Sequence, residues 1–573
     1  DLFVAGIDTT SSIVEWIVAE LLRNPHKLAK VRTEIFEVIG KDGTLEEQHI
    51  LKLPFLRAVV KEALRLHPPG PFLVPHKCDE IVSICGFKLP KNAQILVNVW
   101  AIGRDPTIWE NPEMFMPERF LECEIDFKGH DFELIPFGTG KRICPGLPLA
   151  HRSMHLVVAS LVHNFEWKLA DGTIPHSVHA LDHHKYSIVF MHPSPKWRKL
   201  RRVCATKIFS PQALDSTQIL RQQKVHKLLD FVEERCKKGE VLDIGEAIFT
   251  TTLNSISTTL FSMDLSNSTS EESQENKNII RAMMEEAGRP NVADFFPILR
   301  PLDPQRSFAR MSNYFKKMFK IIDGITEERM CSRLLETDSK VYKDVLDSLI
   351  NIEETGYQLS HNEMLHLFLD LLVAGIDTTS NTVEWIMAEL LRNPDKMEKA
   401  RKELSQTIDK DAIIEESHIL KLPFLQAVVK ETLRLHPPAP FLVPHKCDEM
   451  VSISSFNVPK NAQVLVNVWA MGRDPAIWEN PEMFMPERFL EREIDFKGHD
   501  FEFIPFGAGK RICPGLPFAH RTMHLMVASL VHNFEWKLAD GLMPEHMNMK
   551  EQYGLTLKKA QPLLVQAIAI THI

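Results

Sequence analysis

The strongest constraint on the fold is a long internal repeat. Residues 1–172 align with residues 370–541 at a constant offset of 369 without a gap, and 137 of the 172 positions are identical. Solenoid repeats are much shorter and much less alike, so the chain holds two copies of one fragment of a larger fold. The differences gather in Val31–Leu45 and Ile81–Leu89, as expected for a surface helix and a surface loop.

The end of the repeat predicts a domain boundary. After Gly172 the first copy runs into a sequence that occurs only once, whereas the second copy continues from Leu542 to the end of the chain. We therefore expect a fragment at 1–172 and a longer piece at 173–573. The chain also opens inside an apparent helix at Asp1, which we interpret as a cut.

Composition narrows the class of protein. The apolar fraction of 44% and the charged fraction of 25% are typical of a globular protein. A net charge of −9 argues against nucleic acid as a partner. The nine cysteines include no Cys-x-x-Cys pair, which favours a reducing compartment over a disulfide framework. Without a long apolar run or a signal peptide, we expect no membrane anchor in this chain.

A glycine-rich stretch near the end of the second copy presents a cysteine as a metal ligand. It reads Phe506-Gly507-Ala508-Gly509-Lys510-Arg511-Ile512-Cys513-Pro514-Gly515, and the run Leu516–Val531 after it looks helical. Cys513 would lie near a helix N-terminus, where the dipole and nearby amides favour a thiolate. An inert buried cysteine in a glycine-rich turn is the alternative.

A second stretch predicts one long helix over Leu365–Leu391, with Ala374-Gly375-Ile376-Asp377-Thr378-Thr379 inside it. Threonine and glycine lower helix stability. The Thr378 hydroxyl can instead bond the carbonyl of Ala374 and bend or open the helix. Other helices are predicted at Leu214–Cys236 and Phe308–Met330, and Pro195 begins a further one.

Together these stretches resemble the cytochrome P-450 family, whose haem-ligand signature is Phe-x-x-Gly-x-Arg-x-Cys-x-Gly. The resemblance implies a mainly α fold with a minor β-sheet part. Residues 173–573 would run from the B–C loop to the C-terminus and would lack the anchor and helices A and B. Residues 1–172 would be a duplicated fragment from helix I to helix L.

The resemblance also implies the site. The cofactor would be haem b, with Cys513 as axial ligand of its iron and Cys144 of the first copy unused. Thr378 would hydrogen-bond the oxygen substrate and Asp377 would help to deliver protons. Further cofactor-binding residues would be Trp197, Arg201, His445, Phe506, Gly507, Arg511 and Gly515. Glu431, Arg434 and Arg488 would form a buried charged triad. No role is assigned to the pair His183-His184.

The first copy repeats part of this set. It contains Asp8-Thr9, Glu62, Arg65, Arg119 and the loop that ends at Cys144. What it lacks is a helix C of its own, so the two copies would compete for one. The second copy is continuous with the segment that ends at residue 360, keeps the whole start of its long helix and retains residues 542–573, and we therefore expect the haem on Cys513.

The implied activity is insertion of one oxygen atom from O2 into a small apolar substrate. Electrons would come from NADPH through NADPH-cytochrome P-450 reductase, at the cytosolic face of the endoplasmic reticulum. The residues of the motifs resemble those of a plant geraniol-hydroxylase-like subgroup, whose members oxidise terpenoids in secondary metabolism. A basic patch for the reductase would comprise Lys196, Arg198, Lys199, Arg202 and Lys207. Candidate substrate contacts are Phe368, Leu372, Ala374, Ala439, Phe441 and Leu555.

Two alternatives stay open. One is a haem-thiolate isomerase or dehydratase that needs no reductase, against which the intact pair Asp377-Thr378 argues. The other is a catalytically inactive product of a joined tandem gene pair.

Overall fold

The computed structural model describes residues 2–40, 43, 45–84, 87–165, 175–266, 271–295, 297–334, 344–350, 359–409, 412–453, 456–552 and 554–570. The chain divides into two compact units, Asp1–Leu169 (unit 1) and Ala170–Ile573 (unit 2). Each unit has a hydrophobic core of its own.

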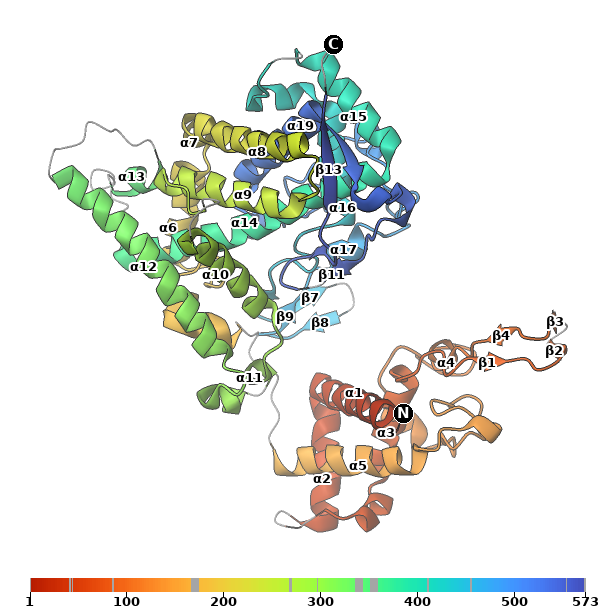
Figure 1. The fold of residues 1–573 in the computed structure, drawn as a ribbon. Coiled ribbons are helices and arrows are strands. Elements are labelled where there is room, and N and C mark those ends of the chain that lie inside the picture. The colour runs from red at the N-terminus through yellow and green to blue at the C-terminus, as the bar shows by residue number, and fades with distance from the viewer. Residues whose placement is uncertain are drawn as a thin grey trace. The chain divides into compact units, whose positions relative to one another are not determined.

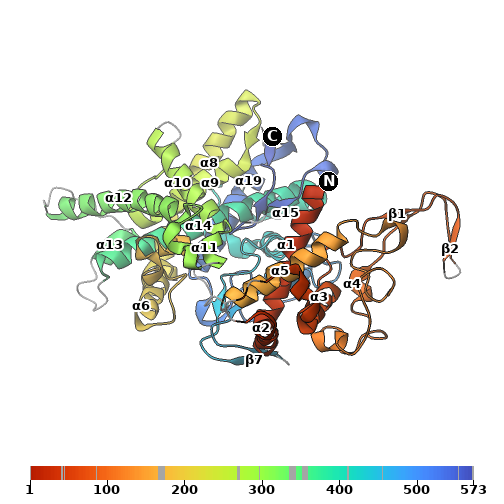
Figure 2. The ribbon, with the colours of Figure 1, turned by 90° about the horizontal axis from the view of Figure 1, so that it is seen from below.

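Unit 1 is built from four longer helices around one apolar core (Figures 1 and 2). These helices are α1 (Leu2–Arg23), α2 (Pro25–Ile39), α3 (Pro54–Leu66) and α5 (Leu147–Asn164). Two small antiparallel pairs accompany them, β1 (His76–Lys77) with β4 (Gln94–Ile95) and β2 (Val82–Ile84) with β3 (Phe87–Leu89). The short helices are α4 (Val99–Ile102), η1 (Glu47–Lys52), η2 (Pro117–Phe120) and η3 (Gly140–Arg142).

Unit 2 is also mainly helical. Its α-helices are α6 (Pro195–Val203), α7 (Pro211–Ser216), α8 (Gln218–Lys238), α9 (Ile244–Phe261), α10 (Glu271–Gly288), α11 (Val292–Phe295), α12 (Ser307–Leu334), α13 (Val345–Ile350), α14 (His361–Arg392), α15 (Pro394–Thr407), α16 (Pro423–Leu435), α17 (Val468–Met471), α18 (Arg488–Glu491) and α19 (Leu516–Asn533). The other helical turns are η4 (His176–Lys185), the π-helix η5 (Cys204–Ile208), η6 (Pro297–Leu302), η8 (Glu416–Lys421), η9 (Gly509–Arg511), η10 (Ala539–Gly541) and η11 (Pro544–His546).

The strands of unit 2 form small antiparallel sheets at the edge of the helical part. The strands are β5 (Leu242–Asp243), β6 (His445–Lys446), β7 (Val451–Ile453), β8 (Phe456–Val458), β9 (Gln463–Val464), β10 (Phe534–Leu538), β11 (Glu551–Gln552), β12 (Lys558–Lys559) and β13 (Leu564–Ala569). The largest sheet has the order β10-β13-β5, with Phe534 opposite Ala569 and Leu564 opposite Asp243. The other pairs are β6-β9, β7-β8 and β11-β12.

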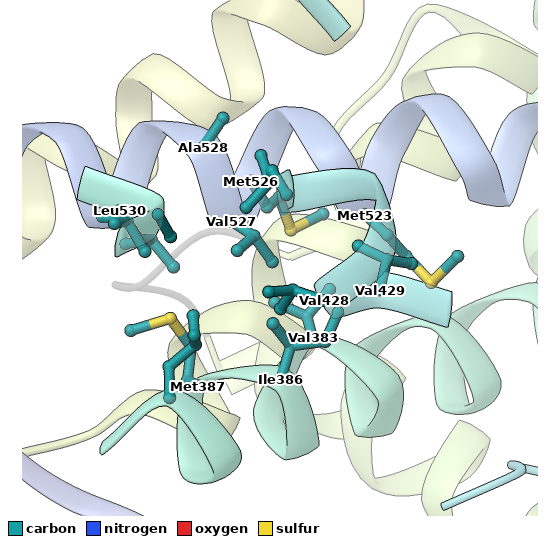
Figure 3. Packing of buried hydrophobic residues seen from close by; sticks show 14 of the residues in the cluster. Val383, Ile386, Met387, Val428, Val429, Met523, Met526, Val527, Ala528 and Leu530 are labelled. Atoms are coloured by element: carbon teal, nitrogen blue, oxygen red, sulfur yellow. The ribbon is translucent and has the colours of Figure 1, made fainter. Parts of the chain in front are cut away.

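Helix α14 is the central element of unit 2. Ser360 caps its start in a capping box with Glu363, which satisfies backbone N–H groups that a helix end leaves open. Its C-terminal half packs with α16 and α19, where Val383, Ile386 and Met387 meet apolar side chains of both helices (Figure 3). Its N-terminal half packs against α9 in a second apolar cluster.

The segment Leu214–Cys236 is mostly helical, as its apolar spacing predicted. One residue, Thr217, interrupts it, because α7 ends at Ser216 and α8 starts at Gln218. The hydroxyl of Thr217 accounts for the break, because it donates to the carbonyl oxygens of Ala213 at 3.0 Å and Leu214 at 3.2 Å. Such local bonds compete with a continuing helix.

Candidate functional site

The loop before α19 holds Cys513 in a tight turn. Gly507 and Gly509 have φ angles of 74° and 62°, a region that side chains with a Cβ rarely adopt. The backbone N–H of Cys513 donates to the carbonyl of Phe506 at 2.9 Å, which closes the turn. Helix α19 begins three residues later, at Leu516, with Gly515 as its N-cap.

Opposing influences act on the Cys513 thiol. Burial raises its pKa, whereas the backbone N–H groups of Gly515 and Leu516 and the guanidinium of Arg201 lower it. The sequence predicted the helix-terminus effect but assigned no cation from outside the loop to the sulfur. Burial outweighs these donors, so the thiol is favoured until a positive partner binds the sulfur.

Cys513 opens onto a cavity inside unit 2. The cavity encloses about 1630 Å³ of space free of atoms, counting the part that is open to solvent. Its walls come from η5, α9, α14, the segment Pro438–His445 and the start of α19. Most of the lining is apolar, with threonine hydroxyls on the α14 side. Such a largely apolar space suits an apolar ligand.

Helix α14 presents Thr378 to this cavity. The Thr378 hydroxyl donates to the carbonyl of Ala374 at 2.7 Å, and α14 is continuous through this point. Asp377 is not among the residues that line the cavity. Its carboxylate instead accepts hydrogen bonds from Thr556 and, at 3.3 Å, from Asn381.

Two arginines lie at the edge of the cavity. Arg201 donates through Nη2 to the carbonyl of Ile512 at 2.5 Å, and Arg511 donates through Nη2 to that of Met191 at 2.7 Å. The guanidinium of Arg511 also lies over the ring of Trp197, 4.9 Å from its centroid. The indole N–H of Trp197 donates to Ile188 at 3.0 Å. All three residues line the cavity.

His445 lines the same edge of the cavity, and both burial and the nearby Arg511 lower its pKa. The histidine is therefore neutral at physiological pH. It can donate one hydrogen bond to an anion without adding a charge.

The residues Glu431, Arg434 and Arg488 come together in the interior of unit 2. Arg434 bonds the carboxylate of Glu431 through two nitrogens at 2.7 and 2.8 Å, and Arg488 reaches it at 3.1 Å. Glu431 is 0% exposed and Arg434 1%. Backbone groups provide further hydrogen bonds to these side chains. The Met485 N–H, for example, donates to the Glu431 carboxylate at 2.7 Å. Such a buried cluster depends on every partner.

Comparison with known proteins identifies the family. The profile of the family described as cytochrome P-450 matches residues 1–181 and 173–565. Geraniol 8-hydroxylase of Catharanthus roseus is 45% identical over 392 residues, which are 68% of this chain and 79% of that protein. Ferruginol synthase of Isodon rubescens is 42% identical over 434 residues, 74% of this chain and 88% of that protein.

The chain belongs to the cytochrome P-450 family. Among solved structures, a zebra fish cytochrome P-450 with progesterone has a TM-score of 0.58 at 23% identity, covering 69% of this chain and 88% of that one. The same kind of protein with abiraterone gives a TM-score of 0.57 at 24% identity, covering 70% and 87%. These two structures agree with the predicted fold. Oxidoreductase activity is general to the family and its relatives.

The residues present fit the haem that this P-450 family carries. A Cβ atom at Gly515 would lie 3.8 Å from the sulfur of Cys513, so the glycine leaves the space beside the thiol open. The guanidinium groups of Arg201 and Arg511 would balance two carboxylates at the rim. Phe506 and Gly507 line the cavity next to the thiol.

The proposed substrate contacts divide into two groups in the P-450 structure. Ala374 and Ala439 line the cavity. Phe368 and Leu372 are fully buried in the core, and Phe368 contacts Phe261 edge-on at 4.8 Å. Phe441 and Leu555 are 43% and 47% exposed, and neither lines the cavity. Helical periodicity alone could not tell which face of α14 looks into the cavity.

The duplicated site residues of unit 1 lie in a different environment. Glu62, Arg65 and Arg119 form the same cluster as in unit 2, with Glu62–Arg65 distances of 2.8 Å and an Arg119 distance of 3.3 Å. Cys144, however, is exposed. The side chain of Asp8 lies outside the described residues.

Sequence reasoning missed the polar groups that fasten the cavity wall. Asp370 of α14 accepts from the Ser187 hydroxyl at 2.9 Å and from the Ile188 N–H at 2.8 Å, and His183 contacts it at 3.1 Å. Ile188 lines the cavity, so these bonds fix part of its wall. An aspartate within the apolar run before Ala374 was the signal that could have found them, because a buried carboxylate needs donors.

Proposed function

We propose that this chain is a haem-thiolate monooxygenase that inserts one oxygen atom from O2 into a small apolar substrate, a terpenoid. The opening of the Cys513 thiol onto an apolar cavity under Thr378 is the observation that carries the proposal. Family membership supports the reaction class.

Cys513 would hold haem b as its axial thiolate ligand. Trp197, Arg201, His445 and Arg511 would hold the two propionates, since their donors are gathered at one rim of the cavity. When bound, the haem would activate O2, so that one oxygen atom enters the substrate and the other leaves as water. Phe506, Gly507 and Gly515 would leave the room that the flat group needs beside the thiol.

Thr378 and Asp377 of α14 would take part in proton transfer. The Thr378 hydroxyl can exchange its bond to Ala374 for a bond to oxygen or water in the cavity. Burial raises the pKa of Asp377, which brings its carboxyl closer to the range in which it can both bind and release a proton.

The electrons would come from NADPH through NADPH-cytochrome P-450 reductase at the cytosolic face of the endoplasmic reticulum. Of the basic patch, Arg198, Arg202 and Lys207 are exposed. Lys199 pairs with Glu363 at 3.1 Å, and Lys196 lies over the ring of Tyr186 at 3.5 Å. An acidic partner surface would meet chiefly the exposed side chains of this patch. Within the described residues, no helix has the length and apolar character needed to cross a bilayer.

A terpenoid substrate follows from the relatives and from the cavity. Geraniol 8-hydroxylase and ferruginol synthase are named for terpenoid substrates or products. An apolar cavity lined by small residues such as Ala374 and Ala439 would admit a hydrocarbon skeleton.

Reconstitution of the purified full chain with haem and the reductase tests the proposal. Geraniol would serve as the probe substrate, with NADPH consumption and oxidised product measured together. We expect a thiolate-type carbon monoxide difference spectrum and product formation. We also expect Thr378→Ala to keep the spectrum but to release peroxide in place of product. Absence of the spectrum from the parent would overturn the proposal.

A further inference from the structure

Asp377 has its hydrogen-bond partners on the side of α14 that faces the C-terminal segment. The Thr556 hydroxyl donates to Oδ2 of Asp377. Asn381, one turn along α14, donates to the same oxygen at 3.3 Å and to the Thr556 hydroxyl at 3.5 Å. Thr556 is thus both donor to the carboxylate and acceptor from the amide, and the three side chains form a closed ring.

The chain around Thr556 is itself held in place. The next residue, Leu557, donates its backbone N–H to the carbonyl of Pro438 at 2.9 Å. Strand β12 follows at once and pairs with β11. Thr556 is 8% exposed, so its hydroxyl has little access to water and depends on Asp377 and Asn381 for its hydrogen bonds.

Charged groups from several elements face the carboxyl. Lys558 of β12 and Arg281 of α10 both lower the pKa of Asp377, though burial dominates and raises it. Arg281 also pairs with Glu246 of α9. Among the contributions that lower the pKa, the hydrogen bond from Thr556 is the largest. A neutral hydroxyl therefore affects this carboxyl more than either cation does.

We propose that Thr556 is a positioning residue that holds the Asp377 carboxylate towards the C-terminal segment, away from the cavity, and so sets its readiness to carry protons to Thr378. The inference rests on the proposed function and extends it to a residue far along the chain. The next residue of α14, Thr378, lines the cavity. Release of the Thr556 bond would therefore free the Asp377 carboxyl to reach that wall. Thr556 acts through Asp377 and does not touch the reacting atoms.

The first experiment reads the carboxyl itself and needs no turnover. Infrared spectra of the full chain are recorded over a pH series, and the carboxylic acid band that Asp377→Asn removes is assigned to Asp377. We expect Thr556→Val to move the midpoint of that band to higher pH, because the carboxylate loses its strongest donor. Thr556→Ser should keep the parental midpoint.

A matched control is Thr522→Val. Thr522 is a buried threonine of α19 whose hydroxyl has no hydrogen-bond partner in the described structure. Its replacement should leave the Asp377 band unchanged. Thr556→Ala serves as a second donor-free variant if Thr556→Val does not fold. An unchanged midpoint in the folded donor-free variant, or no Asp377 band at any pH in the parent, overturns the inference.

The second experiment measures coupling in the reconstituted enzyme. The ratio of peroxide to product per NADPH should rise several-fold in Thr556→Val and stay parental in Thr556→Ser. Equal ratios in Thr556→Val and the parent also count against the inference. If the parent shows no thiolate-ligated haem, the proposed function fails, and the infrared series still decides how Asp377 is held.

Discussion

Unit 1 and residues 370–541 of unit 2 are two regions with nearly the same sequence and different surroundings. Helix α3 (Pro54–Leu66) and helix α16 (Pro423–Leu435) occupy equivalent residues, as do α5 and α19. The buried cluster of one glutamate and two arginines also forms in both, with similar distances. The repeat therefore encodes these elements and this cluster without help from the rest of the chain.

The exposure of equivalent side chains separates the two regions. Trp16 is 45% exposed and Trp385 1%, although each stacks on a histidine at 3.8 Å. Ile7 is 66% exposed, whereas its equivalent Ile376 is 0% exposed. In unit 2, helix α14 is covered by α9, α10, α12 and β12, which occur once in the chain.

The two regions also differ in the surroundings of their equivalent cysteines. Cys513 opens onto a cavity whose walls include η5, α9 and Trp197 of α6, all supplied by sequence that occurs once. Cys144 has the same loop around it but is exposed. The comparison teaches that the cysteine loop forms locally, whereas a place for a cofactor requires the flanking helices.

Replacement of the two cysteines tests the comparison most strongly. We expect Cys513→Ala to abolish the thiolate-type carbon monoxide difference spectrum and Cys144→Ala to leave it unchanged. The reason is that Cys513 lies in the wall of a cavity, whereas Cys144 is exposed. The spectrum of the two variants, normalised to protein, is the measurement. Loss of the spectrum in Cys144→Ala would show that unit 1 supplies the ligand.

The buried charge clusters should respond alike in the two regions. Glu431→Gln and Glu62→Gln each leave two arginines without a counter-charge, at a cost of about 3–5 kcal/mol. Hydrogen exchange with mass spectrometry can read α3 and α16 separately, because Arg57 and Gln426 distinguish their peptides. We expect each variant to raise exchange in its own helix only. Faster exchange in both helices would mean that the two regions do not fold independently.

The two tryptophans should respond differently. Trp385→Phe is expected to lower the free energy of unfolding by about 2 kcal/mol, because the site is buried and cannot fully collapse. Trp16→Phe should change it by less than about 0.5 kcal/mol, as at exposed sites. Urea unfolding followed by circular dichroism measures both. Equal losses would indicate that the Trp16 face is covered in solution.

A buried glutamate adds a pH dependence to unit 2. Burial raises the pKa of Glu384 from 4.5 to about 7, and Asp243 adds to the rise. Between these values the folded protein holds a proton that the unfolded chain has lost, so the free energy of unfolding falls as pH rises. We expect Glu384→Gln to remove this fall, which a shift from 4.5 to about 7 makes about 3 kcal/mol. Its equivalent Glu15 is exposed.

The positions of several long helices could be predicted from the sequence. The predicted span Leu365–Leu391 lies within α14 (His361–Arg392), and Phe308–Met330 lies within α12 (Ser307–Leu334). Apolar periodicity carries these elements, and the capping residues lie next to them. The cysteine loop could also be predicted, because its glycines lie at positions with positive φ angles.

Contacts between segments far apart in the chain could not be predicted from the sequence. The bond from Thr556 to Asp377 joins residues 179 positions apart, and the bond from Ser187 to Asp370 joins residues 183 positions apart. Neither pair is close enough in the chain to form a recognisable sequence motif. The interruption at Thr217 has no marker in the apolar pattern, which continues across it.

The sequence by itself determined the helices of the repeat, the turn around the cysteine and the pairing of Glu431 with Arg434, because each depends on residues close in the chain. The tertiary structure decided which cysteine faces a cavity, in which direction the Cys513 and Asp377 pKa values move, and which side of α14 Asp377 occupies. Desolvation is the physical reason. It depends on which atoms exclude water, and those atoms come from segments that the local sequence does not name.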